Sequence, residues 1–326
     1  MSRTRAVCCP DKFRGTLTAP EAAAAMARGL REAGIEEVVA CPLADGGEGT
    51  LDALLAGLGG ERRSARVTGP LGEPVDADWG FLFDGTAVVE MAQASGLALA
   101  GAANDPVAAT TRGTGELIAL AARSGAARIV VGAGGSATTD GGRGALEALD
   151  WSLSAPVVVA CDVETRFLDA ARVYGPQKGA APEEIGLLTE RLERLAALYR
   201  ERTGLDVRSL AGSGAAGGLA GGLAALGAEL KPGFEVVAEV LHLRRVLEGA
   251  DLVLTGEGRL DSTSFAGKVV GGVLATLDDS VRCVVICGQI ENGVLAMLPR
   301  PAEVISLAGR SGAPEELVRE AARAAA

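Results

Sequence analysis

The chain has 326 residues, which is enough for two domains or for one domain that carries a large insertion. Its 48% hydrophobic content is ample for a core, and the 46 glycines and 3% aromatic residues indicate a core built mainly of Ala, Val and Leu. The net charge of −11 argues against nucleic acid or an anionic membrane as a partner, so an anionic substrate would need a local basic pocket.

The six cysteines lie mostly in or beside apolar runs, which is typical of buried free thiols. Cys283 and Cys287 have no matching His or Cys pair, so no zinc site is expected. The sequence shows no N-terminal signal pattern and no apolar run long enough to span a bilayer. We therefore expect a cytoplasmic protein with reduced thiols.

The first 60 residues alternate between strand-like and helix-like segments. Apolar runs predict strands at 5–10 and 36–43, and residue composition predicts helices at 18–34 and 49–59. Thr18 and Glu21 match a capping box, Pro20 suits the first helical turn, and Gly34 ends the first helix. This βαβα order predicts a parallel sheet.

Beyond residue 61 the pattern changes. Residues 62–92 alternate apolar and polar side chains between Gly, Pro and Asp turns and predict antiparallel strands. Helices are then expected at 114–126, 142–150 and 181–204, and strands at 127–135 and 155–163.

The α/β pattern of the start returns near residue 250. Strands are expected at 250–258, 282–289 and 302–309, with a helix at 267–279. We predict an α/β protein in which residues 1–61 and 241–326 form a doubly wound parallel sheet. Residues 62–240 are expected to form an inserted α/β domain with antiparallel strands.

Three polar loops follow strands of the predicted sheet: DKFRGT (11–16), ADGGEG (44–49) and TGEGRLD (255–261). Ligands of open α/β sheets bind at the carboxyl ends of the strands. Asp11, Lys12 and Arg14 also precede a capped helix N-terminus, which attracts anions. Glycines let such loops approach a ligand closely, and acids among them suit a metal or a substrate hydroxyl.

Two further glycine-rich stretches lie in the predicted insertion. GGSATTDGG (134–142), taken with Gly132, fits the weak G-x-G-x-x-A dinucleotide fingerprint, but the acid Asp150 ends a helix instead of following a second strand. A backbone cradle for a phosphate or carboxylate, with Asp140 as its acid, is favoured instead. GSGAAGG (212–218) is consistent with either a phosphate cradle or a tight helix–helix contact.

Other chemistry-bearing residues are few. Lys178 in YGPQKG is expected as a mobile cation after a proline turn, and Lys268 lies at a predicted helix start. Neither a P-loop pattern nor a protein-kinase motif set occurs. The only histidine, His242, lies in a helical apolar pattern and is expected to be an ordinary surface or packing residue, so acid–base chemistry falls to Asp, Glu or Lys.

Taken together, these motifs resemble the bacterial glycerate kinase family, which carries DSFKGS, ADGGEGT and TGEGRxDxQ signatures. They occur in order from about residue 6 to residue 275. The resemblance implies phosphorylation of D-glycerate to 2-phosphoglycerate or 3-phosphoglycerate, with ATP and Mg²⁺. It also implies a flavodoxin- or Rossmann-like domain, a second α/β domain and an active site in the cleft between them.

The resemblance assigns roles to the acids of the three loops. Phosphoryl transfer depends on positioning and charge neutralisation more than on covalent chemistry. Asp45 and Glu48 are expected to hold Mg²⁺, which needs only one or two carboxylates. Asp45 is also a candidate for the catalytic base, together with Asp11 and Asp261.

The remaining predicted site residues bind the substrate or the nucleotide. Lys12 and Arg14 are expected to bind the glycerate carboxylate or the phosphates. Predicted cofactor-binding residues are Gly134, Gly135, Ser136, Thr138, Gly214, Gly217, Gly218, Glu257 and Lys268.

The chain departs from the family pattern in several places. Arg14 replaces a lysine, Thr263 replaces an amide, and Thr165 replaces an asparagine. The stretch near residues 150–156 is also shorter than the family pattern. These departures leave open a catalytically degenerate glycerate-binding protein, and the weak fingerprint leaves open a nicotinamide-dependent oxidoreductase of a small hydroxy acid. The sequence does not decide between a monomer and a homodimer.

Overall fold

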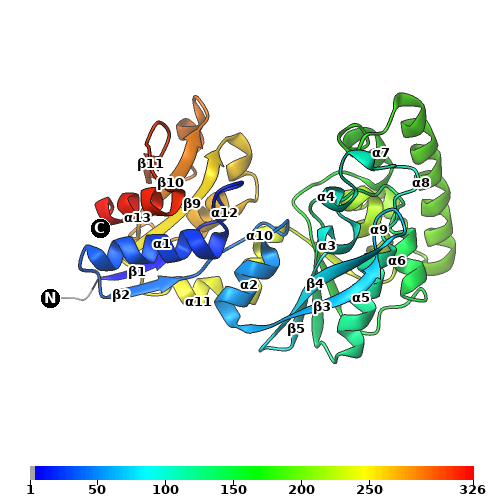
Figure 1. Cartoon of the computed structure of the whole chain (residues 1–326), viewed down its shortest axis with the longest axis horizontal. Coiled ribbons are helices and arrows are strands. Elements are labelled where there is room, and N and C mark those ends of the chain that lie inside the picture. The colour runs from blue at the N-terminus through cyan, green and yellow to red at the C-terminus, as the bar shows by residue number, and fades with distance from the viewer. Residues whose placement is uncertain (1–3) are drawn as a thin grey trace. The chain divides into compact units, whose positions relative to one another are not determined.

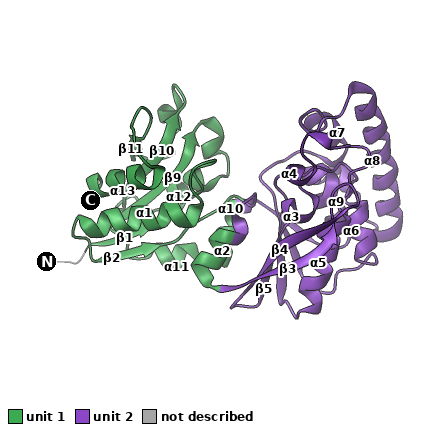
Figure 2. Ribbon diagram, in the orientation of Figure 1, with its two compact units in different colours: residues 1–45, 52–59, 234–326 green, residues 46–51, 60–233 purple. Residues whose placement is uncertain are grey.

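The structure of the chain, a computed structural model, describes residues 4–326. It divides into two units, coloured separately in Figure 2. Unit 1 contains the residues up to Asp45 together with Asp52–Gly59 and Phe234–Ala326, and unit 2 contains Gly46–Leu51 and Gly60–Gly233. The ADGGEG stretch is therefore divided between the units, directly after Asp45.

Unit 1 holds a five-stranded sheet in the order β11-β10-β9-β1-β2, and every pairing in it is parallel. Counted along the chain, the order is 2-1-3-4-5, the flavodoxin-like arrangement. The predicted doubly wound α/β fold class is confirmed. The strands are β1 (Arg5–Cys8), β2 (Glu37–Ala40), β9 (Leu252–Leu260), β10 (Arg282–Ile290) and β11 (Glu303–Ser306).

Helices pack on both faces of this sheet because successive strand side chains point to opposite faces. On β10, Val284 and Ile286 belong to a core shared with α1 (Ala19–Glu32) and α13 (Pro314–Ala324). Cys283 and Val285, on the other face, belong to a core shared with α12 (Val269–Thr276). Figure 1 shows α1 and α13 side by side. The other helices of this part of the chain are α2 (Thr50–Leu58), α10 (Gly233–Val240) and α11 (Leu243–Leu247).

The predicted capping box at the start of α1 is confirmed. The Glu21 amide donates to Thr18 Oγ1 (3.3 Å), and the Thr18 amide donates to Glu21 Oε2 (2.8 Å). Pro20 occupies the first turn. A cap of this kind contributes about 1 kcal/mol and fixes where the loop after β1 ends.

Unit 2 holds a six-stranded sheet in the order β3-β4-β5-β6-β7-β8. The predicted antiparallel strands are confirmed as β3, β4 and β5, and β5 to β8 pair in parallel. The strands are β3 (Gly60–Thr68), β4 (Pro74–Leu82), β5 (Thr86–Glu90), β6 (Arg128–Gly132), β7 (Val157–Ala160) and β8 (Glu229–Lys231).

One large core fills unit 2, and its aromatic centre comes from three segments. Tyr199, on α8 (Pro182–Thr203), makes edge-to-face contacts with Phe167 and Trp151. Such contacts add about 0.5–1.5 kcal/mol each beyond the area they bury. The other helices of unit 2 are α3 (Ala92–Ser95), α4 (Leu97–Ala100), α5 (Arg112–Arg123), α6 (Arg143–Ala148), α7 (Ala170–Tyr174) and α9 (Leu219–Ala225).

Two expectations about single residue types have clear outcomes. As predicted, the six cysteines are free thiols, and five of them are buried. Cys161 is partly exposed. His242 is an exposed surface residue, as expected, but it lies between α10 and α11 with φ of 51° and not within a helix. Within residues 4–326 no helix is both long and apolar enough to cross a membrane.

Candidate active site

The carboxyl edge of the unit 1 sheet gathers the acids that the sequence singled out. Asp11 and Lys12 follow β1, Asp45 follows β2, and Glu257 lies near the carboxyl end of β9. The Asp11 amide donates to the Gly256 carbonyl (2.9 Å), which joins the loop after β1 to β9. Strands β1 and β9 are neighbours whose connections leave in opposite directions, the switch point where open α/β sheets bind ligands.

Lys12 links two of these carboxylates. Its Nζ lies 3.8 Å from Asp11 Oδ1 and 3.6 Å from Asp45 Oδ1. The structure therefore brings together Asp11, Lys12 and Asp45, three of the predicted catalytic residues. Asp45 is half-buried and Asp11 is buried, so the two acids differ in their access to water.

The pKa of Asp11 is raised to about 6, chiefly by burial and also by the nearby charge of Asp45, while Lys12 and Lys268 oppose the shift. Burial also raises the pKa of Glu257 to about 7, with the hydrogen bond from Ser264 opposing it. Oε1 of Glu257 is buried and has no hydrogen-bond partner. An unpaired buried carboxylate oxygen is costly, which is typical of a functional site.

The loop after β9 engages Asp261 in a cap. Asp261 Oδ1 accepts from the Thr263 amide (2.9 Å) and hydroxyl (2.6 Å), and these bonds lower the pKa of Asp261. Lys268 Nζ donates to Thr263 Oγ1 (3.0 Å). Thr263, where the sequence lost the family's amide, thus connects Asp261 to Lys268. Oδ1 of Asp261 is therefore engaged within its own loop.

Arg14 differs from its neighbours. It lies in a tight turn in which the Phe13 amide donates to the Leu17 carbonyl (2.8 Å) and Gly15 has φ of 80°. Arg14 is exposed and forms no ion pair with any residue in the described range 4–326. Of the two predicted cations after β1, the structure brings only Lys12 to the acids.

The predicted metal ligands Asp45 and Glu48 fall in different units, and Glu48 is exposed. Across residues 4–326, no three acidic, histidine or cysteine side chains converge to hold a metal by themselves. Mg²⁺ in phosphotransferases needs only one or two carboxylates, with water and phosphate oxygens completing its ligands. The unpaired oxygen of Glu257 beside Asp11 fits that requirement.

In unit 2 the GGSATTDGG stretch follows β6. Gly134 and Ser136 are half-buried and Gly135 is exposed, whereas Thr138 is buried. Helix α6 begins only at Arg143, well beyond the glycines, so no helix N-terminus follows them directly. The structure does not support a dinucleotide fingerprint here, and with it the nicotinamide alternative loses its basis.

Asp140 holds the end of this stretch in place. Its carboxylate accepts from the Thr111 amide and hydroxyl (both 2.8 Å) and from the amides of Gly142 (3.0 Å) and Gly144 (3.1 Å). The side chain of Asp140 is buried and its oxygens are occupied by these bonds, so Asp140 links the start of α5 to the start of α6. The expected role as the ligand-binding acid of this loop is not supported.

For the second glycine-rich stretch, the contacts favour packing over a cradle. Gly214, Gly217 and Gly218 are buried. A Cβ on Gly217 would overlap the Thr138 carbonyl, and the Gly218 amide already donates to the Gly214 carbonyl (3.2 Å). The three residues were predicted to bind a cofactor, but the structure packs Gly217 and Gly218 against the backbone of residues 138–141 and Gly214 against the backbone of Thr165 and Arg166.

The glycines of ADGGEG also serve close packing, within unit 2. Gly46 has φ of 84°, and a Cβ on it would lie 2.9 Å from the Ala160 Cβ. A buried acid that the sequence analysis missed, Glu90, closes this region by accepting from the Leu51 amide (2.9 Å). The available signal was an acid directly after the apolar strand TAVV.

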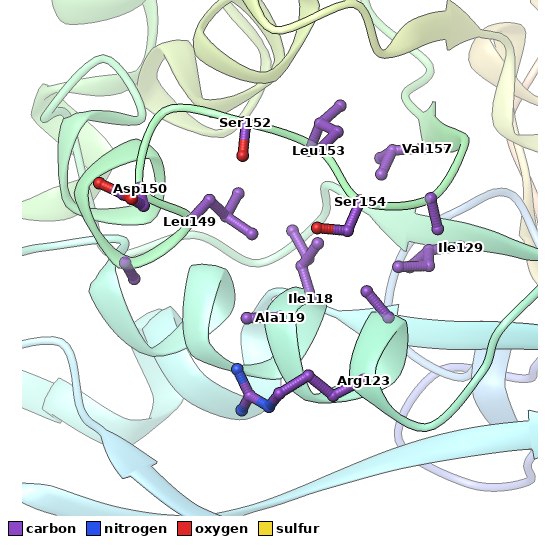
Figure 3. Close-up of a pocket in the computed structure, with 13 residues that line it drawn as sticks. Ile118, Ala119, Arg123, Ile129, Leu149, Asp150, Ser152, Leu153, Ser154 and Val157 are labelled. Carbon is purple, nitrogen blue, oxygen red and sulfur yellow. The ribbon is translucent and has the colours of Figure 1, made fainter.

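A separate pocket of about 330 Å³ lies in unit 2 (Figure 3). It is lined by the starts of β6 and β7, by the end of α5 and by the link from α6 to β7. Asp150 and Trp151, near the start of that link, have φ of 49° and 57°. The pocket therefore lies at the amino ends of the parallel strands, opposite the edge where ligands bind.

Comparison with known proteins decides the family. The model of the glycerate kinase family matches residues 6–155 and 151–326. The chain belongs to the glycerate kinase family. It is 42% identical over 305 residues to glycerate 2-kinase of Escherichia coli K12, covering 82% of this chain and 80% of the relative. It is 38% identical over 325 residues to glycerate kinase of Bacillus subtilis 168, covering 88% and 85%.

The fold agrees with a solved member. A crystal structure assigned as glycerate kinase 2 from Salmonella typhimurium LT2 matches with a TM-score of 0.88 at 36% identity, covering 99% of this chain and 97% of that one. The chain is therefore an enzyme of the glycerate kinase family. The two parts of the family match overlap at residues 151–155, and residues 152–155 line the pocket of Figure 3.

Proposed function

We propose that this chain transfers the γ-phosphate of ATP to a hydroxyl of D-glycerate with Mg²⁺, and that the acidic cluster after β1, β2 and β9 carries out the chemistry. The observation that carries the proposal is the contact of Lys12 with both Asp11 and Asp45 at the switch point of the unit 1 sheet. The names of the relatives support the substrate.

The chemistry requires a base, cations and a metal site, and unit 1 contains candidates for each. Asp45 is half-buried and reaches the ammonium of Lys12, so it is the acid best placed to accept the proton of the glycerate hydroxyl. Lys12 and Lys268 supply positive charge for phosphate oxygens. Asp11 and Glu257 would hold Mg²⁺, which when bound neutralises the charge on the transferred phosphoryl group.

The first test is an assay of ADP release with D-glycerate, ATP and Mg²⁺, in which each component is omitted in turn. Turnover should require all three, and phosphorus NMR of the product should show whether the 2-hydroxyl or the 3-hydroxyl carries the phosphate. Absence of turnover in folded protein whose melting temperature D-glycerate still raises would identify a binding protein instead.

A further inference from the structure

Unit 2 contains a second pocket, of about 500 Å³, which shares no residue with the pocket of Figure 3. Its walls come from the loop before α5, from α6 and from one face of α8. None of the residues predicted to be catalytic, or to bind a metal or a cofactor, lines it. The proposed chemistry therefore assigns this pocket no role.

Three arginines line this pocket. Arg143 is the first residue of α6, and Arg191 and Arg194 lie one turn apart on α8, where residues three positions apart share a face. The acids that line the pocket are Asp140 and Glu147. Arginine thus outnumbers acid in this pocket, although the whole chain carries a net charge of −11. A local basic pocket of this kind is what an anion needs in order to bind an acidic protein.

Two of the three guanidinium groups are exposed and have donors to spare. Arg143 Nε donates to Glu147 Oε1 (2.7 Å), and no acceptor in residues 4–326 takes its other N–H groups. Arg194 NH1 lies 3.7 Å from Glu190 Oε2, which is too long for a hydrogen bond. Because a guanidinium carries five N–H donors, most of the donors on these two side chains remain available to a ligand.

Arg191 is half-buried and has no acid partner. Its NH1 donates to the Val107 carbonyl (2.8 Å), and it forms no ion pair with any carboxylate in the part of the chain that the structure describes. A carbonyl dipole satisfies one donor but supplies no negative charge. Partial burial of a charge is costly unless an opposite charge reaches it, and an anion in the pocket would supply that charge.

The lysine that the sequence singled out in unit 2 is not accessible in this way. Lys178 is 3% exposed and its Nζ donates to the Thr138 carbonyl (2.6 Å), so its expectation as a mobile cation is wrong. Its own carbonyl accepts from Asn104 Nδ2 (2.8 Å). Lys178 is therefore part of the packed interior, whereas the three arginines present their charge to a cavity.

The other walls of the pocket narrow the class of ligand. Thr110 Oγ1 accepts from the Arg112 amide (3.2 Å) and keeps its own hydrogen for a further acceptor. Leu195 and Leu198 supply an apolar wall. Guanidinium groups bind carboxylates and phosphates in a bidentate manner, and the volume is in the range of small-molecule sites. The walls therefore suit a short carbon skeleton that carries several anionic groups.

We propose that this pocket binds a small organic anion with two or more carboxylate or phosphate groups, held by the guanidinium groups of Arg143, Arg191 and Arg194. The inference goes beyond the proposed function, because it adds a second ligand site whose residues are separate from the acidic cluster of unit 1. The anionic groups could be carboxylates alone or could include a phosphate ester, and the binding experiment separates these two sources.

The test is calorimetric titration of the full chain at pH 7.5 without ATP, D-glycerate or Mg²⁺. The probes are citrate, which carries only carboxylates, 3-phosphoglycerate, which adds a phosphate ester, and acetate, which carries a single charge. Citrate or 3-phosphoglycerate should bind at least about tenfold more tightly than acetate. That affinity should fall as salt is added, because the arginines are accessible to solvent.

Paired variants locate the binding. Arg143→Gln combined with Arg194→Gln removes two charged donors, and should weaken the bound probe at least about tenfold. Lysine at both positions keeps the charge without the planar fork and should restore part of the affinity. Arg200→Gln is the matched control, because Arg200 is also exposed on α8 but does not line the pocket. All of these variants should melt near the wild-type temperature.

Each outcome decides the inference. Binding of citrate alone, of 3-phosphoglycerate alone or of both, weakened in the paired glutamine variant, supports the site and identifies the anionic groups that it takes. Absence of binding by both probes would overturn the proposal, as would unchanged affinity in the paired glutamine variant or an equal loss in Arg200→Gln. Binding that is lost in Lys12→Met but kept in the paired glutamine variant would place the anion at the acidic cluster and also overturn it. Because no turnover is required, a chain that binds in this way but fails the ADP-release assay would refute the proposed function and leave this inference standing.

Discussion

The ammonium of Lys12 lies 3.6 Å from the carboxylate of Asp45, which joins the loops that follow β1 and β2. Lys12 also approaches Asp11, so one cation partly neutralises two acids at the carboxyl edge of the sheet. Close acids of this kind repel each other and raise each other's pKa unless a cation lies between them. The proposed chemistry therefore depends on Lys12 more than on Arg14, the other basic residue of the same loop.

Replacement of Lys12 should damage catalysis more than replacement of Arg14. Lys12→Met removes the charge between Asp11 and Asp45, and we expect kcat/KM for D-glycerate to fall at least about tenfold. Arg14→Met, in the same exposed turn, should change it less than Lys12→Met does. Steady-state kinetics of the two variants test this, and an equal or larger loss for Arg14→Met would contradict the role given to Lys12.

Glu257 should make the ligand-free protein less stable as the pH rises. Its pKa is raised from 4.5 to about 7 in the folded state, so the folded protein holds a proton that the unfolded chain has lost. The resulting stabilisation is present below pH 4.5 and is lost as the pH rises through 7. In EDTA, the stability of Glu257→Gln relative to the wild type should improve between pH 5 and pH 8. An unchanged difference in melting temperature would show that Glu257 does not titrate as expected.

Gly217 should tolerate no side chain. It has φ of 64°, and a Cβ would overlap the Thr138 carbonyl, so Gly217→Ala should cost about 2 kcal/mol or more of unfolding free energy. Gly186→Ala is a matched control within α8, because a Cβ there meets nothing within 4 Å. That substitution should stabilise the protein by about 0.5–1 kcal/mol. Urea unfolding distinguishes the two, and similar midpoints would contradict the packing role of Gly217.

Asp140 should behave as a structural acid. Asp140→Ala leaves the buried amides of Thr111, Gly142 and Gly144 without their acceptor, so we expect a loss of about 3 kcal/mol or more. Glu193→Ala, on the exposed side of α8, should stay within about 0.5 kcal/mol of the wild type. Wild-type stability in Asp140→Ala, combined with weaker ligand binding, would return Asp140 to the ligand site.

Local patterns predicted the secondary structure well because each predicted element carried its own signal. Alternation of apolar and polar residues marked β3 and β4, and Thr18 with Glu21 marked the start of α1. The roles of single glycines and acids were harder to predict from the sequence, because Gly217 and Asp140 contact residues that are distant in sequence. Nothing near Lys178 in the sequence indicated burial, since its partners Thr138 and Asn104 lie 40 and 74 positions away. Motif order indicated the acids of unit 1 but not that Glu257 would be the one with an unpaired oxygen.

Turnover of D-glycerate by Asp45→Asn tests the central claim most directly. Asp279→Asn, an exposed acid before β10, is the matched control, and both variants should melt at the wild-type temperature. If Asp45 accepts the hydroxyl proton, kcat with saturating ATP and Mg²⁺ should fall at least about 100-fold in Asp45→Asn and stay unchanged in Asp279→Asn. Near-normal turnover by folded Asp45→Asn would contradict the assignment of Asp45 as the base and, with it, the mechanism proposed for the acidic cluster.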